Sequence, residues 1–176
     1  RYVLFSGRHR YYKGLEYLVR AAPDIKASVV LAGDGPERPN VEALARRIGA
    51  PVRFVGALSH EELVAHLHGC DVFVFPSVER SEAFGLSILE AHASGRPVVA
   101  TRLGTGVEVA NLDGITGLNV PPRDPRALAE SVNRLLDDEP LRSAMGENAR
   151  NRVRREFHAK QAARAEFDLF QEALSR

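Results

Sequence analysis

The chain has 176 residues, of which 44% are apolar and 27% are charged, and its formal net charge is +1. This length and composition predict one globular domain with a sizeable core. The sequence contains no apolar run long enough to cross a bilayer. The balanced charge gives no overall attraction to nucleic acid, so we expect no nucleic-acid partner.

Strands and helices are predicted to alternate along the chain. Short runs rich in β-branched residues indicate strands, while capping residues, glycine and proline mark the ends of helices. The predicted strands are Tyr2–Ser6, Ser28–Ala32, Val52–Val55, Asp71–Phe75, Pro97–Thr101 and Gly117–Val120. The predicted helices are Gly14–Ala22, Pro39–Ile48, Ser59–His68, Leu86–Gly95, Val107–Asn111, one that starts at Asp124, Pro140–Arg155 and His158–Leu174. This alternation predicts an α/β fold: a doubly wound, Rossmann-like parallel sheet of about six strands with helices on both faces.

The loop after the fourth predicted strand is the most informative part of the sequence. It carries Glu82 and leads into a helix whose second turn carries Glu90. The amides of Phe84, Gly85 and Leu86 are expected to be free donors at the start of this helix, and glycine lets a ligand approach the backbone closely. These features predict a site in which amides bind a phosphate and carboxylates bind sugar hydroxyls.

Other loops are predicted to reach the same edge of the sheet. The first carries Arg8 and Lys13, two cations that suit a diphosphate, although solvated side chains would explain them equally well. The turn that begins at Gly33 is weak evidence for ligand binding, because a purely structural turn would have the same sequence. The loop that begins at Gly56 could receive a flat base. The turn Gly104–Gly106 either borders the ligand or is a plain tight turn.

Nothing in the sequence calls for a metal. The chain contains no Asp-x-Asp pair, and His60, His66 and His68 occur in an ordinary amphipathic helical pattern rather than at the spacing of a zinc site. We therefore expect no metal and no cofactor.

The cysteine content and the arginine-rich segment bear on location. The single cysteine, Cys70, allows no internal disulfide and suits a reducing compartment, and no secretory signal opens the sequence. We therefore expect a cytoplasmic protein.

A cluster of four arginines is interpreted first as a solvated helix face. The alternative is contact with anionic lipid at the inner face of the membrane, or with a partner domain. The cluster consists of Arg150, Arg152, Arg154 and Arg155.

Taken in order, these motifs resemble the C-terminal half of retaining GT-B glycosyltransferases of family 4, within glycosyl transferases group 1. The likeness runs from Val3 to about Phe157, and its most specific part is Glu82-x7-Glu90 with Phe-Gly-Leu between the two glutamates. The weaker pieces are Gly7-Arg8 to Lys13-Gly14, Gly33-Asp34-Gly35-Pro36, Gly95-Arg96-Pro97-Val98-Val99-Ala100 and Asp113-Gly114-Ile115-Thr116-Gly117-Leu118. One departure is Ala83, where many members have glycine. We expect little loss from it, because alanine accepts a negative φ.

The resemblance implies a role for each candidate residue. Arg8 and Lys13 would hold the diphosphate and stabilise the leaving group, which makes them catalytic together with Glu82. Glu82 would accept hydrogen bonds from the donor sugar, and Glu90 from the ribose. The remaining donor-binding residues would be Phe84, Gly85, Leu86, Gly33 and Gly56.

The resemblance also implies a division of labour within a longer protein. Residues 1–176 would form one nucleotide-sugar-binding domain, with a Rossmann-like core at 1–155 and a C-terminal helix at 156–176. The implied reaction moves a hexosyl unit from a GDP-mannose or UDP-glucose type of donor to a glycan or lipid-linked acceptor in surface polysaccharide synthesis. A missing N-terminal domain would bind the acceptor, so we expect the isolated domain to bind donor but transfer little. The last helix would dock on that domain, and in its absence would favour self-association.

Two other functions stay open on sequence grounds. One is a non-catalytic nucleotide-sugar-binding module, and the other is a GT-B-like sugar-nucleotide epimerase. A dinucleotide oxidoreductase is disfavoured, because no Gly-x-Gly-x-x-Gly follows the first strand.

Overall fold

The computed structural model describes residues 1–157, 167, 170–171 and 173–174. A six-stranded sheet lies at its centre, and all neighbouring strands in it are parallel. Its strands are β1 (Tyr2–Ser6), β2 (Ser28–Ala32), β3 (Val52–Gly56), β4 (Val72–Phe75), β5 (Val98–Thr101) and β6 (Gly117–Val120). Their order across the sheet is β3-β2-β1-β4-β5-β6. This is the strand order of a Rossmann fold, so the predicted doubly wound sheet is confirmed.

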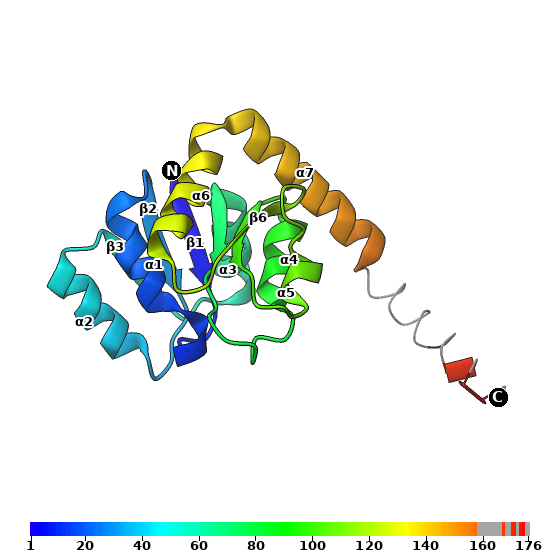
Figure 1. The fold of residues 1–176 in the computed structure, drawn as a ribbon, viewed down its shortest axis with the longest axis horizontal. Coiled ribbons are helices and arrows are strands. Elements are labelled where there is room, and N and C mark those ends of the chain that lie inside the picture. Colours follow the sequence, from blue (N-terminus) through cyan, green and yellow to red (C-terminus); the bar gives the residue numbers. More distant parts are fainter. Residues whose placement is uncertain (158–166, 168–169, 172, 175–176) are drawn as a thin grey trace.

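Helices cover both faces of the sheet (Figure 1). On one face lie α1 (Leu15–Ala21), α2 (Arg38–Ile48) and α6 (Pro125–Asp137). On the other face lie α3 (His60–Gly69), α4 (Leu86–Ala93) and α5 (Val107–Ala110). The long α7 (Glu139–Glu156) packs against α4 and α6, and two short 3-10 segments are η1 (Tyr11–Lys13) and η2 (Ala22–Asp24).

The strands alternate their side chains between the two cores. In β1, Val3 and Phe5 belong to the core under α1, α2 and α6, whereas Leu4 belongs to the core under α3, α4 and α5. All three side chains are fully buried. This pattern explains the unbroken apolar runs in the sequence, because both faces of a parallel sheet are covered.

Capping residues fix several helix ends where the sequence predicts them. Ser59 and Glu62 form a reciprocal capping box at the start of α3, with hydrogen bonds of 3.2 and 2.8 Å. At the start of α6, the Asp124 carboxylate accepts a hydrogen bond from the Ala127 amide at 3.0 Å. The first helix begins one residue later than predicted, because Gly14 takes a left-handed conformation with φ 64°.

The arginine cluster of α7 is not a uniformly solvated face, and that interpretation is wrong for two of its four residues. Arg152 is buried and donates to the carbonyl of Ala110 at 3.0 Å, and Arg150 is half-buried and donates to the carbonyl of Ser94 at 3.1 Å. Only Arg154 and Arg155 are exposed. The reason is the packing of α7 on α4, which turns one side of the cluster inward. The predicted helix His158–Leu174 falls largely outside the described residues.

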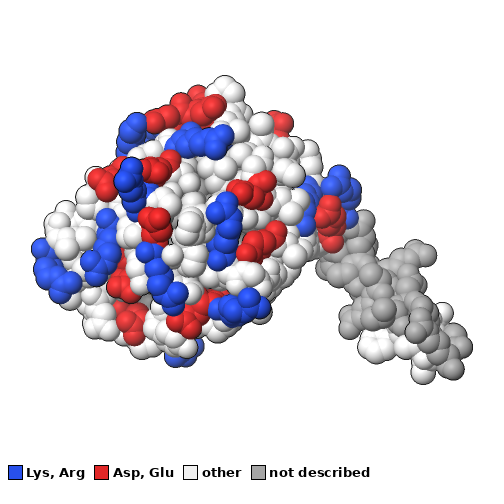
Figure 2. Space-filling view, in the orientation of Figure 1, with Lys and Arg blue, Asp and Glu red and all other residues white. Residues whose placement is uncertain are grey.

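The surface charge is mixed over the face that carries α1, α2 and α6. Figure 2 shows basic and acidic side chains interspersed there, in keeping with the net charge of +1. In the part of the chain that the structure describes, no helix is both long enough and apolar enough to span a bilayer.

Candidate functional site

The candidate site lies where the loops after β1 and β4 meet. These two strands are neighbours at the centre of the sheet, and the chain leaves β1 toward α1 on one face and β4 toward α4 on the other. In doubly wound sheets this reversal opens a crevice beyond the carboxyl ends of the strands, and ligands bind there. Lys13 and Glu82 come from these two loops.

Lys13 and Glu82 form a nearly enclosed ion pair. The Lys13 Nζ atom lies 2.5 Å from Glu82 Oε2, and the two side chains are 13% and 11% exposed. Ser77, which follows β4, donates its hydroxyl to the same oxygen at 3.0 Å. The Lys13 ammonium also lies 5.0 Å from the ring centroid of Phe75, a contact that favours a cation. Among the described residues, Glu82 Oε1 has no hydrogen-bond partner, so this oxygen is free to accept one.

The last residue of β5 and the turn that follows it hold the Glu82 loop in place. The Thr105 hydroxyl donates to the carbonyl of Glu82 at 2.9 Å, and the Thr101 hydroxyl donates to the carbonyl of Ser77. The turn Gly104–Gly106, which the sequence left open between two interpretations, therefore packs against the site and supports it. Sequence analysis missed both threonines and Ser77, because hydroxyl residues are common and their role depends on the pairing of β4 with β5.

The start of α4 supplies free backbone donors beside Glu82. The amides of Phe84, Gly85 and Leu86 donate no hydrogen bond to any described residue. Gly85 takes a left-handed conformation with φ 83°, and a Cβ there would come within 2.9 Å of Phe75 and 3.0 Å of Ile88. Only glycine satisfies both constraints, and it keeps the first turn open to an anion.

The departure from the family pattern at Ala83 carries no backbone strain. Among the described residues, Arg123 is the only non-glycine residue with a positive φ, which is 61°.

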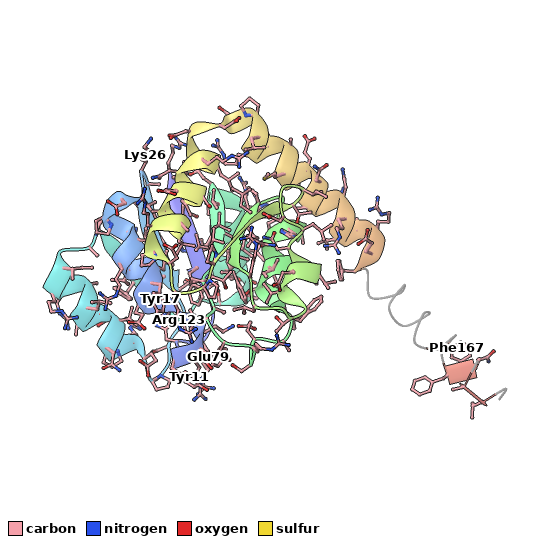
Figure 3. The ribbon with its side chains drawn as sticks, viewed as in Figure 1. Tyr11, Tyr17, Lys26, Glu79, Arg123 and Phe167 are labelled. Carbon is pink, nitrogen blue, oxygen red and sulfur yellow. The ribbon has the colours of Figure 1, made fainter. Side chains whose placement is uncertain are left out.

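Arg123 lies in the loop between β6 and α6 and donates to Glu79 of the Glu82 loop at 3.1 Å, and Figure 3 shows the two side chains next to one another. This exposed pair connects a third loop to the site, and no sequence pattern predicts it.

Glu90 is not in contact with the Lys13–Glu82 pair. It lies in the second turn of α4 and is exposed, and its carboxylate makes no ion pair or hydrogen bond with any described residue. The structure therefore places the two predicted carboxylates in different states, one paired and enclosed and the other open to solvent.

Arg8 points to another part of the site than Lys13. Arg8 is exposed, has no ion pair within the described part of the chain, and lines an open pocket of about 600 Å³. The pocket is lined by Gly7, Arg8, Gly33, Asp34, Gly35, Pro36 and Ala57. The Gly33 amide donates to the carbonyl of Gly56 at 2.6 Å, and a Cβ on Gly33 would overlap the carbonyl oxygen of Gly7. The structure thus brings Arg8, Gly33 and Gly56 together at the ends of β1, β2 and β3.

A buried histidine joins the first two loops, and sequence analysis missed it. The His9 amide donates to the carbonyl of Asp34 at 2.9 Å, and the His9 carbonyl accepts from the amide of Glu37 at 3.1 Å. The imidazole is fully buried, and this burial lowers the pKa of His9, which favours the neutral ring.

The described residues contain no group of three or more His, Cys, Asp or Glu side chains that could hold a metal ion. Of the histidines in α3, His60 and His68 are exposed.

Comparisons with known proteins agree on one family. The model of the family described as glycosyl transferases group 1 matches residues 1–152. The chain is 38% identical over 170 residues to O-antigen chain mannosyltransferase C of Escherichia coli, and 40% identical over 160 residues to a D-rhamnosyltransferase of Pseudomonas aeruginosa. These matches cover 96% and 90% of this chain but 46% and 42% of the two relatives, so the chain spans less than half of their length.

The solved structures agree on the fold. The structure of the Anabaena protein HepE in complex with UDP and glucose has a TM-score of 0.87 against this chain, at 21% identity. The match covers 97% of this chain and 48% of HepE.

Proposed function

This chain belongs to the glycosyl transferases group 1 family, and from this premise we propose that it is the nucleotide-sugar-binding half of a retaining GT-B glycosyltransferase of family 4. The enzyme moves a hexosyl unit from a donor of the GDP-mannose or UDP-glucose type to a glycan or lipid-linked acceptor in surface polysaccharide synthesis. The O-antigen mannosyltransferase and the D-rhamnosyltransferase support sugar transfer, and HepE, which shares the fold, was solved with UDP and glucose.

The observation that carries this proposal is the meeting of Lys13, Glu82 and the free amides of α4 at one point of the sheet. Lys13 supplies a cation, Glu82 keeps a free carboxylate oxygen, and the amides of Gly85 and Leu86 at the start of α4 donate to no described acceptor. A nucleotide sugar presents an anionic diphosphate next to a ring of hydroxyls. Those groups match the cation, the amides and the carboxylate.

In the proposed reaction, positive charge stabilises the departing diphosphate. Negative charge builds on the diphosphate as the bond from the sugar to phosphate breaks. Lys13, Arg8 and the first-turn amides of α4 are preorganised donors for that charge. They supply it without a metal, so we propose a metal-independent enzyme. Donor binding measured with and without EDTA should then be the same.

The two carboxylates bind hydroxyls in this proposal. Glu82 accepts from the donor sugar through its free oxygen, and Glu90 accepts from the ribose; we assign neither a nucleophilic role. The open pocket beside Arg8, Gly33 and Gly56 receives the base. Each hydrogen bond to a charged carboxylate contributes about 1.5–3 kcal/mol, and so its loss weakens binding by roughly tenfold to a hundredfold.

Calorimetric titration tests the proposal directly. The chain is titrated with GDP, UDP and their mannose and glucose conjugates, and the titrations are repeated with Lys13→Ala and Glu90→Ala. We expect one nucleotide family to bind, and both variants to bind it roughly tenfold to a hundredfold more weakly. The matched controls are Lys26→Ala, whose ammonium pairs with Asp137, and Glu147→Ala on the exposed side of α7.

A failure to bind has a defined meaning. If neither this chain nor the longer protein binds any of these nucleotides, the proposed ligand class is wrong. Product analysis of the longer protein with and without acceptor tests the reaction itself. A transferase gives a glycosylated acceptor, an epimerase releases an altered sugar without acceptor, and a binding module gives no product.

A further inference from the structure

The site keeps the Lys13 cation in an internal ion pair. Lys13 Nζ lies 2.5 Å from Glu82 Oε2, both side chains are nearly enclosed, and Ser77 fixes the same oxygen from the other side. A carboxylate at this distance cancels most of the field of the ammonium toward a third charge. Glu82 therefore neutralises the cation that we propose for the diphosphate.

A diphosphate that approaches Lys13 also approaches the Glu82 carboxylate. The two anions repel each other across a site with little exposure to water, where charges are weakly screened. We propose that Glu82 competes with the diphosphate for Lys13, and that the donor sugar relieves this competition by donating its hydroxyls to the carboxylate. The inference rests on the proposed function and deepens it.

The competition discriminates between donor and product. A nucleotide sugar brings hydroxyls that satisfy Glu82 while its diphosphate takes Lys13. A nucleoside diphosphate brings the charge without those hydroxyls, so the carboxylate returns to Lys13 and opposes binding. After transfer, the loss of the sugar from the donor therefore promotes release of the product.

Glu90 provides the contrast within the same site. It is exposed, and no described cation pairs with it. Removing Glu90 takes away a hydrogen bond to the ligand without freeing a cation. The two glutamates should therefore have opposite effects on the binding of a nucleoside diphosphate.

The test compares Glu82→Gln with Glu90→Gln by calorimetry, with GDP, UDP and their mannose and glucose conjugates. We expect Glu82→Gln to bind the nucleoside diphosphate about tenfold more tightly than the unaltered chain, a change of about 1.4 kcal/mol. Its preference for the sugar conjugate over the diphosphate should fall. Glu90→Gln should bind both more weakly. A folded Glu82→Gln that binds the diphosphate no more tightly than the unaltered chain overturns the inference.

A second measurement covers the case in which Glu82→Gln does not fold, since it leaves Lys13 enclosed without a counter-charge. A crystal structure of the unaltered protein with the nucleotide sugar should show Lys13 Nζ and Glu82 Oε2 beyond ion-pair distance, about 4 Å. If the ion pair stays closed in that complex, this inference is overturned and the proposed function is not. If the unaltered protein binds no nucleotide at all, the proposed function fails, and this inference loses its basis with it.

Discussion

At the scale of single residues, Gly85 shows how backbone conformation and packing act together at the site. Its φ of 83° lies in the left-handed region, and the space where a Cβ would sit is taken by Phe75 and Ile88. The residue also begins α4, so its conformation sets the direction of the free amides beside Glu82. If the proposed function is right, stability and nucleotide binding depend on the same backbone geometry.

Replacing this glycine should affect both properties. In Gly85→Ala, the left-handed conformation costs about 1–2 kcal/mol, and the contact with Phe75 adds about 1–3 kcal/mol of overpacking. We expect the free energy of unfolding to fall by the sum of these costs, measured by urea denaturation. Nucleotide binding should weaken as well, because the amides of Gly85 and Leu86 shift.

Gly49→Ala is the matched control for this prediction. Gly49 ends α2 with φ 64°, and nothing lies within 4 Å of the position of its Cβ. Its substitution carries only the conformational cost, so it should destabilise the chain less than Gly85→Ala and leave nucleotide binding unchanged. Equal losses of stability in the two variants would show that packing against Phe75 contributes nothing.

Residues of the candidate site could be predicted from the sequence when a charged residue or a glycine occurs in a strand-to-helix loop. Glu82, Gly85 and Lys13 stand out because charges and glycines in strand-to-helix loops suggest ligands. Ser77 and Thr101 do not stand out, because a hydroxyl gains its role only from the neighbour that the fold brings to it. The contact between Lys13 and Glu82 was not predicted for the same reason.

At the scale of elements, α7 and α4 pack through glycine and arginine. Gly146 of α7 lies against the carbonyl of Gly95, just beyond the end of α4, with no space for a Cβ. Arg150 and Arg152 donate to carbonyls at the ends of α4 and α5. These carbonyls carry the partial negative charge of helix C-termini, which cations stabilise.

This close approach reverses the usual effect of alanine in a helix. In an open helix, glycine to alanine stabilises by about 1 kcal/mol. In Gly146→Ala, the new Cβ would overlap the Gly95 carbonyl, so we expect a loss of about 1–3 kcal/mol instead. Thermal unfolding measures the difference. Ser143→Ala, on the exposed side of the same helix, should leave stability equal or slightly raised; a stabilised Gly146→Ala would contradict the packing described here.

The elements themselves were largely predictable, because their signals are local. Three strands, including Tyr2–Ser6, have the predicted boundaries, and Ser59 and Asp124 cap the helices that they were expected to cap. The environment of α7 was not predictable. Four arginines in a short segment indicate a solvated face, and only the position of α4 turns two of them inward.

At the scale of the whole molecule, strand order decides where the site forms. The alternation of strands and helices predicts a doubly wound sheet, but it does not say which strands are neighbours. Pairing of β1 with β4 places the loops of Lys13 and Glu82 at the switch point of the sheet. Pairing is a long-range property, so the sequence could suggest a shared edge without predicting this contact.

The packing of helices on both faces of the sheet also buries two histidines. His9 follows β1, and His92 lies in the last turn of α4; both are fully buried. Burial lowers the pKa of both, to about 4 for His92, where the nearby Arg152 guanidinium acts in the same direction. A neutral imidazole is therefore part of the folded state, while the unfolded chain takes up the proton near pH 6.5.

The stability of the chain should consequently fall as the pH drops below about 6.5 and continue to fall toward pH 4, because the unfolded state binds more protons in this range. For His92 alone, the loss between neutral pH and pH 5 amounts to roughly 2 kcal/mol. Urea denaturation at a series of pH values measures it. His92→Gln removes the titrating group and should flatten the dependence of the free energy of unfolding on pH, whatever its effect on stability at pH 7. The control is His60→Gln, at an exposed position, which should leave the slope unchanged. An unaltered slope in His92→Gln would mean that other groups, such as buried His9, control the response to acid.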